Sequence, residues 1–258
     1  MQSDSFANLR TLILGTPKDF AEWNILMVAF GDSVTQGLTV NPKMAGEDVY
    51  HSVLRRELHR EFPERTFSTI NAGINGKTTQ GALPLLEGNV LRHCPHLVIV
   101  SFGLNDSSGG ESGLPRFEEN LTKIVTQILR SGAAVVLMTP NMMASRDSAR
   151  VDPNFRHALA DLIQRQTSGL LARYAGQVRQ VGAATGAPVA DVYAEWERRQ
   201  AQGEDMNAHL ANGLNHPDAF GHRLAGEVLS RTILSELRQG PSIPGDASAK
   251  GGGHGRRS

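Results

Sequence analysis

A short glycine-bounded segment carries the residue best suited to nucleophilic chemistry in this chain. Ser33 lies within Gly31–Gly37, which follows directly on the apolar run Ile25–Phe30. A short apolar run that ends at glycine is typical of a buried strand, and open α/β sheets place ligands where a strand turns into a helix. A serine hydroxyl is a weak nucleophile at its free pKa, so it needs a base and oxyanion donors from elsewhere in the chain.

His216 is the best candidate for that base. It lies in a loop just before the last predicted helix, where Pro217 and the start of the helix are expected to hold the loop in place. From there the imidazole could take the proton of Ser33. His222 lies on the helix itself and is expected to pack against the loop rather than act as the base.

Donors for a developing oxyanion are found at the ends of three predicted strands. Ser33 follows the first strand, Gly73 the second and Asn105 the third. The carboxyl ends of parallel strands lie at one edge of a sheet, so these three loops can converge. The backbone amides of Ser33 and Gly73 and the side-chain amide of Asn105 would then supply three hydrogen-bond donors. Asp32 is expected to order the serine turn by accepting from nearby backbone amides.

These residues are positioned by strands and helices that alternate along the chain. Apolar runs predict strands at 25–30, 67–71, 97–102, 134–138 and 188–190. Helical patterns are found at 49–61, from Thr78 or Thr79 towards 92, at 117–129, over 155–181 and at 219–237. Five strands separated by helices imply one doubly wound domain, residues 1–240, with a parallel sheet covered on both faces. Residues 241–258 are rich in Gly, Ser and Pro and are expected to be a disordered tail.

Composition excludes several classes of partner. Lys plus Arg and Asp plus Glu each number 26 in the 258 residues, so there is no electrostatic case for nucleic acid or an anionic membrane. The single cysteine, Cys94, excludes an internal disulfide and fits a reducing compartment. The segment Met1–Leu14 lacks a signal-peptide pattern, and no apolar run approaches the roughly 20 residues that span a bilayer. We therefore expect a cytoplasmic protein.

His93, Cys94 and His96 are expected to form a solvated loop rather than a metal site.

Four of these blocks, taken in order, resemble the SGNH (GDSL-type) hydrolases. Each block alone is weak evidence, but together they cover about residues 25–235. The resemblance implies a flavodoxin-like three-layer α/β/α sandwich with a five-stranded parallel sheet, a serine nucleophile and ester hydrolysis without a metal or other cofactor. It also implies the oxyanion roles given above. The four blocks are Gly31-Asp32-Ser33, Gly73, Gly103-Leu104-Asn105-Asp106 and His216-Pro217.

The chain departs from the family at the third member of the catalytic triad. The family places an aspartate three residues before the histidine, where this chain has Gly213. Asn212 could accept a hydrogen bond from the imidazole, and Asp205 could be brought in by the intervening loop. A backbone carbonyl or a Ser-His dyad is also open. The predicted catalytic residues are therefore Ser33 and His216, with Asn212 or Asp205 as candidate orienters.

The predicted function is a serine esterase, a carboxylic ester hydrolase that acts through an acyl-serine intermediate. Its expected partner is a small-molecule or carbohydrate ester with a short acyl group, for example acetyl, because no long apolar lid segment is evident. A thioesterase or lysophospholipase acting on longer acyl chains is the alternative within enzymes. Met142 and Met143 could line an acyl or alcohol pocket, although methionine is also a common gap filler in cores.

An anion-binding module, whose Gly31–Gly37 turn cradles an anion at a helix N-terminus, is the alternative outside enzymes. That turn lacks the lysine and the spacing of a phosphate loop. Asn105 and His216 would also have no role in such a module, so the sequence favours the esterase.

Overall fold

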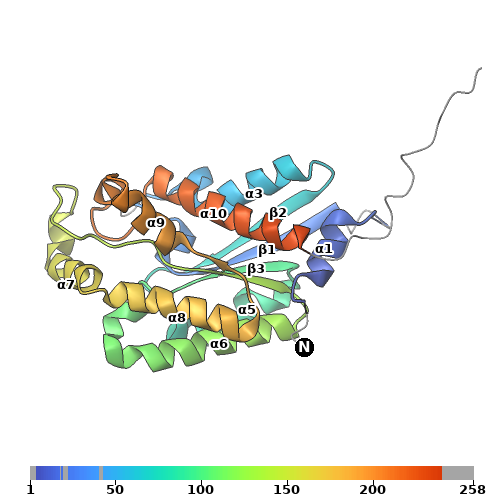
Figure 1. Ribbon diagram of the computed structural model, residues 1–258, viewed down its shortest axis with the longest axis horizontal. Coiled ribbons are helices and arrows are strands. Elements are labelled where there is room, and N and C mark those ends of the chain that lie inside the picture. Colours follow the sequence, from blue (N-terminus) through green and yellow to red (C-terminus); the bar gives the residue numbers. More distant parts are fainter. Residues whose placement is uncertain (1–3, 18, 20–22, 41–42, 240–258) are drawn as a thin grey trace, which may run out of the picture.

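A five-stranded parallel sheet lies at the centre of the computed structural model, which describes residues 4–17, 19, 23–40 and 43–239 (Figure 1). The strand order is β2-β1-β3-β4-β5, and every neighbouring pair is parallel. This is the order of flavodoxin-like sheets, so the predicted fold class is confirmed. The predicted tail, 241–258, lies outside the described residues. The strands are β1 (Asn24–Gly31), β2 (Thr66–Gly73), β3 (Leu97–Ser101), β4 (Ala134–Met138) and β5 (Val189–Ala190).

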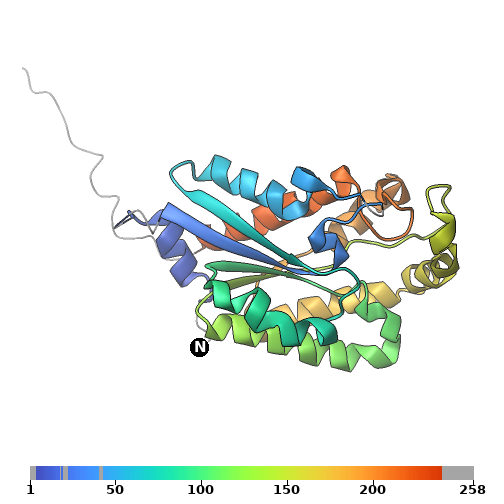
Figure 2. The same ribbon diagram turned by 180° about the vertical axis from the view of Figure 1, so that it is seen from behind.

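Helices cover both faces of this sheet and complete a three-layer sandwich (Figures 1 and 2). Helices α3 (Tyr50–Glu61) and α10 (Ala219–Arg238) lie on one face, and α6 (Leu114–Arg130) and α8 (Leu170–Thr185) lie on the other. The other helices are α1 (Ala7–Leu14), α2 (Ser33–Gln36), α4 (Thr79–Ala82), α5 (Leu86–Asn89), α7 (Arg156–Thr167) and α9 (Val192–Ala201).

The burial of the strands follows from this layering. Every residue of β3 and β4 is buried. Their nearly continuous apolar runs are what central parallel strands require, because helices cover both of their faces. The edge strand β2 is half-exposed along most of its length. The register pairs Gly31 with both Gly73 and Ser101. The loops that follow the first three strands therefore leave the sheet at one edge.

Two predicted helices are interrupted. The helical pattern over 155–181 forms two helices, α7 and α8, because the chain turns at Gly169, where φ is +74°. Glycine accepts this left-handed conformation without a steric cost, and it commonly ends helices. The segment from Thr79 towards 92 consists of short turns, α4 and α5 among them. Pro84 stands at the start of one of these turns, where its missing amide hydrogen cannot extend the preceding helix. Helices α1 and α9 were not predicted.

His222 of α10 is a buried histidine without hydrogen bonds. Its side chain is 0 % exposed, and within the described residues neither ring nitrogen has a hydrogen-bond partner. The ring stacks on that of Tyr50 on α3 at an interplanar angle of 24°, with 6.4 Å between the ring centroids. Burial lowers the pKa of His222 from 6.5 to about 3, because a charged ring cannot be solvated there. His222 thus packs against Tyr50 of α3, whereas the sequence predicted packing against the loop that carries His216.

This burial predicts acid sensitivity of the fold. The unfolded chain takes up a proton at His222 near pH 6.5, whereas the folded chain resists it down to about pH 3. Stability from the neutral ring is therefore fully present above pH 6.5 and decreases as the pH falls through this window, by at most about 1.4 kcal/mol per pH unit. We expect the unfolding free energy of wild type to decrease relative to that of His222→Leu as the pH falls. Urea unfolding across this window measures it, with the exposed His157→Leu as control. A pH-independent difference contradicts the prediction.

Candidate active site

Ser33 is the first residue of α2, a single helical turn that begins where β1 ends. Asp32 caps this turn, because its Oδ1 accepts the amide of Val34 at 2.9 Å. The first amides of a helix have no partner inside the helix, so the Ser33 N–H can serve as a donor at this position. The residue is 4 % exposed. Asp32 therefore orders the serine turn as predicted.

Two glycines let α2 pack directly against the strand ends. A Cβ at Gly31 would overlap the hydroxyl of Thr35 and lie 2.6 Å from the carbonyl oxygen of Ser101. A Cβ at Gly73 would overlap the backbone nitrogen of Gln36. Any larger residue at either position would push α2, and with it Ser33, away from the sheet.

The imidazole of His216 lies directly against the serine hydroxyl. Ser33 Oγ is 3.0 Å from Nε2 of His216, although the two residues are 183 positions apart in the sequence. The other ring nitrogen, Nδ1, is 3.1 Å from the carbonyl oxygen of Thr39. A carbonyl only accepts hydrogen bonds, so Nδ1 carries the hydrogen and Nε2 is left as the acceptor. Burial lowers the pKa of His216 and the Thr39 carbonyl partly opposes this, so the neutral ring is favoured and can take a proton.

The prediction that Asn212 or Asp205 orients the imidazole is wrong, because the side chains of both residues bind other groups. The carboxylate of Asp205 pairs with Arg146 at 2.5 Å, on an exposed part of the surface. Asn212 Oδ1 accepts the backbone amides of Leu214, Asn215 and His216, each at 3.0 Å. Asn212 therefore shapes the loop that carries His216 and does not orient its ring.

The acceptor for the imidazole is instead a backbone carbonyl, one of the alternatives that the sequence left open. Sequence reasoning did not find Thr39, because every residue type carries a carbonyl and a pattern of side chains gives no sign of it. The only signal was negative, namely Gly213 at the position where the family has an aspartate.

The three predicted oxyanion donors come from adjoining strand ends, and two of them are hydrogen-bonded within the protein. The amide of Gly73 donates to Asn71 Oδ1 at 3.0 Å. Asn105 Nδ2 donates to the carbonyl oxygen of Lys77 at 3.1 Å and to Asp32 Oδ2 at 3.5 Å. The contact to Asp32 is long and therefore weak, so it is the one that an incoming oxygen can replace at least cost.

Two buried carboxyl groups lie beneath this site. Burial raises the pKa of Asp32 to about 7, the amide of Val34 opposes the rise, and the neighbouring Asp106 adds to it. Burial also raises the pKa of Asp106, whose Oδ1 accepts the amide and the hydroxyl of Thr79 at 2.8 and 2.6 Å. Asp106 thereby ties the segment after β2 to the segment that holds Asn105.

Ser33, Asn105 and His216 open onto a cavity of about 310 Å³. Helix α7 and the turn before it supply one wall, which holds both apolar and charged side chains and was not predicted to be part of the site. Met143 lines the cavity, as expected, whereas Met142 lines a separate hollow. The cavity is lined by Ser33, Leu38, Val40, Asn75, Leu104, Asn105, Met143, Arg150, Asp152, Phe155, Ala158, Leu162, Arg165, Asn212, Leu214, Asn215 and His216.

The described residues contain no group of three or more His, Cys, Asp or Glu side chains that could hold a metal ion. In the segment that holds His93, Cys94 and His96, the cysteine is exposed and forms no disulfide. His96 Nδ1 accepts the amide of Leu26 at 2.9 Å, so this ring fastens the loop before β3 to β1.

Residues 29–224 match the model of the GDSL-like lipase/acylhydrolase family. The chain belongs to this family. Among solved structures it is similar to a lipase/acylhydrolase from Enterococcus faecalis, with 26 % identity and a TM-score of 0.62 over 84 % of this chain and 100 % of that one. It also resembles an acetylxylan esterase from Geobacillus stearothermophilus, with 19 % identity and a TM-score of 0.61 over 81 % of this chain and 94 % of that one. At this identity the second likeness shows the fold alone.

One curated relative is the uncharacterized lipoprotein YqeF of Bacillus subtilis (strain 168). It is 30 % identical over 118 residues, which are 44 % of this chain and 47 % of the relative. The aligned stretch thus spans about half the length of that protein. Within the part of the chain that the structure describes, no helix is both long enough and apolar enough to cross a membrane.

Proposed function

We propose that residues 1–240 form a serine esterase that hydrolyses short-chain or carbohydrate-borne acyl esters through an acyl-serine intermediate at Ser33. The observation that carries this proposal is the 3.0 Å contact between Ser33 Oγ and His216 Nε2, in a ring whose other nitrogen faces a carbonyl. An acyl transfer needs this arrangement of a nucleophile beside a base of fixed tautomer. An anion-binding module has no use for it.

The reaction proceeds in two halves. His216 Nε2 takes the proton of Ser33 as Oγ attacks the ester carbonyl carbon, and the oxyanion accepts from the amides of Ser33 and Gly73 and from Asn105 Nδ2. The tetrahedral intermediate collapses to the acyl-serine while His216 gives its proton to the leaving alcohol. Water then attacks the acyl carbon, and His216 takes the proton of that water. It returns this proton to Ser33 Oγ as the carboxylic acid leaves.

The cavity beside Ser33 limits the size of the acyl or alcohol group that it can hold. The cavity volume of about 310 Å³ is at the small end of the range for ligand sites. This size suits a short acyl group together with part of the alcohol. The acetylxylan esterases among the structural neighbours support a carbohydrate-borne acetyl group. The apolar side chains of Leu38, Phe155 and Leu162 support the second candidate, a thioesterase or lysophospholipase acting on longer chains.

We propose a cytoplasmic location, with neither nucleic acid nor membrane as a partner. Equal numbers of acidic and basic residues and a free, exposed cysteine support this.

Substitution of the nucleophile tests the proposal directly. We expect Ser33→Ala to lower kcat on p-nitrophenyl acetate by about 10⁴ or more, because the chain then has no group that can form the acyl-enzyme. A fluorophosphonate probe should label wild type at Ser33 and leave Ser33→Ala unlabelled. Ser235→Ala, on the exposed side of α10, is the matched control. Unchanged turnover in pure Ser33→Ala protein would exclude the mechanism.

Asn105 supplies the one proposed oxyanion donor that belongs to a side chain, so a substitution can remove it. We expect Asn105→Ala to lower kcat by roughly 10²–10³ with little change in KM, the usual cost of losing one such donor. Steady-state kinetics on p-nitrophenyl acetate measure it. Asn24→Ala is the control, since Asn24 is exposed at the amino end of β1, opposite the site. Full activity in Asn105→Ala would remove this residue from the oxyanion hole.

An acyl panel distinguishes the two candidate substrate classes. We expect kcat/KM to rise from acetyl to butyryl by up to about fourfold per methylene, the gain from burying that group, and to fall for palmitoyl. Phe155 is 41 % exposed and lines the cavity, so Phe155→Ser should reduce the butyryl advantage and leave acetyl turnover unchanged. Leu14→Ser, at a 44 % exposed leucine of α1, is the control. A maximum at palmitoyl would favour the second candidate.

A further inference from the structure

The loop that carries His216 is closed at its base by the pair His209 and Asp218. The amide of Asp218 donates to the carbonyl oxygen of His209 at 2.9 Å, and His209 Nδ1 lies 3.3 Å from Asp218 Oδ2. One step inside, Leu210 and Pro217 form an antiparallel bridge. The carbonyl oxygen of His216 accepts the amide of the next residue inward at 2.8 Å. His216 is therefore fixed to the base of the loop by its own backbone.

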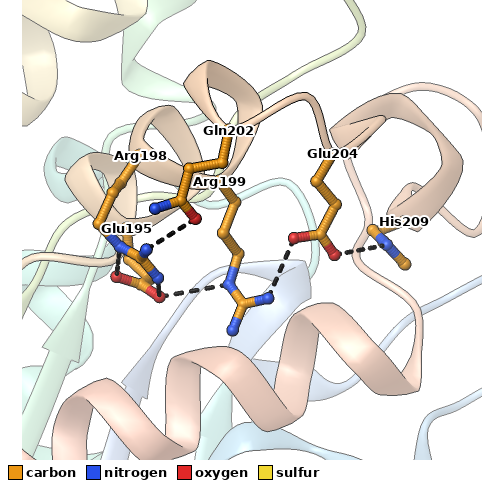
Figure 3. Close-up of polar contacts among 6 residues, drawn as sticks. All are labelled: Glu195, Arg198, Arg199, Gln202, Glu204 and His209. Atoms are coloured by element: carbon orange, nitrogen blue, oxygen red, sulfur yellow. Dashed lines mark hydrogen bonds and ion pairs between the residues drawn. The ribbon is translucent and has the colours of Figure 1, made fainter.

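The ring of His209 joins this base to the surrounding helices (Figure 3). Its Nε2 lies 3.5 Å from Glu204 Oε1, and the other oxygen of Glu204 is 3.0 Å from the guanidinium of Arg199. Arg199 in turn pairs with Glu195, one turn back on α9, at 3.2 Å. The His209 ring also stacks on Phe220 of α10, with 3.9 Å between the ring centroids.

Each nitrogen of the His209 ring faces a carboxylate. A carboxylate only accepts, so the ring can donate to Glu204 and Asp218 together only when both nitrogens carry a hydrogen. The side chains of His209, Glu204 and Asp218 are 23 %, 32 % and 33 % exposed, so these pairs are partly shielded from water. Such pairs hold geometry better than fully exposed ones.

We propose that His209 is a positioning residue that sets the distance between His216 and Ser33, an inference that rests on the proposed ester hydrolysis. The only acceptor at His216 Nδ1 among the described residues is the Thr39 carbonyl, which belongs to a different loop. Because no carboxylate of its own loop holds the imidazole, the position of the ring is set by the base of the loop. A displacement of about 1 Å in a catalytic group can cost 10²-fold in rate, so a looser base lowers turnover.

Substitution by phenylalanine separates the two contacts of His209. His209→Phe keeps an aromatic ring to stack on Phe220 and removes both carboxylate contacts. We expect kcat on p-nitrophenyl acetate to fall about tenfold or more with KM within about twofold, and fluorophosphonate labelling of Ser33 to slow by a similar factor. Arg198→Ala is the matched control. It removes contacts to Glu195 and Gln202 in the same network without touching the loop base, and it should keep wild-type kcat.

A second pair of variants keeps the proposal testable if His209→Phe folds poorly. Asp218→Asn removes the carboxylate but retains an oxygen for the amide of Gly221, so α10 keeps its cap. It should slow turnover in the same way. His209→Gln, which restores a donor towards Asp218, should recover part of the lost rate. Thermal melts followed by circular dichroism establish the folded fraction of each variant.

Three results would overturn the positioning role. These are wild-type kcat in both His209→Phe and Asp218→Asn, a loss no larger than the unfolded fraction, or an equal loss in Arg198→Ala. The comparison of wild type with Ser33→Ala tests the hydrolysis itself. If Ser33→Ala abolishes turnover and the substitutions of His209 do not change it, only the positioning role is overturned and the proposed hydrolysis stands.

Discussion

The hydrogen bond between Ser33 and His216 is the contact on which the rest of the structure depends. It joins the end of β1 to a loop that begins beyond β5, 183 residues later. The two groups meet only because β1 lies inside the sheet and α10, which follows the loop, packs beside α3 on one face. The crossovers that produce the strand order β2-β1-β3-β4-β5 therefore bring Ser33 Oγ to within 3.0 Å of His216 Nε2.

The imidazole differs from that of an ordinary triad because a peptide carbonyl takes the place of the carboxylate. Thr39 fixes the tautomer as a carboxylate would, but it offers a dipole rather than a full charge to the imidazolium. In serine proteases, exchange of the triad aspartate for its amide costs about 10⁴ in kcat, mainly through the wrong tautomer. The carbonyl avoids that particular loss. What it cannot supply is charge stabilisation, and burial, which lowers the pKa of His216, makes the protonated ring costlier still.

Sequence reasoning succeeded where a residue type carries the signal. The apolar runs predicted β1, β3 and β4 to within a residue at each end, and the serine turn and the histidine loop were found from their side chains. It failed where the signal lies in geometry. The helix over 155–181 looked continuous because the apolar positions of α7 and α8 stay in phase across Gly169. The pair between Asp205 and Arg146 depends on two loops that meet only in the folded chain, so the carboxylate could not be placed from sequence.

The serine-histidine pair and the wall of the cavity opposite it belong to different parts of this fold. Helix α7 lines one side of the cavity with Ala158, Leu162 and Arg165 but supplies neither Ser33 nor His216. It is fastened from behind by Gln166, whose Oε1 accepts the amide of Met143 at 2.8 Å and whose Nε2 donates to the hydroxyl of Tyr193 at 3.0 Å. Beside the cavity, Phe155 in the turn before α7 is 41 % exposed, whereas Leu162 of α7 is 6 % exposed and belongs to the core. A substitution at Phe155 therefore changes the shape of the cavity at small cost in stability, whereas a substitution at Leu162 also disturbs the core.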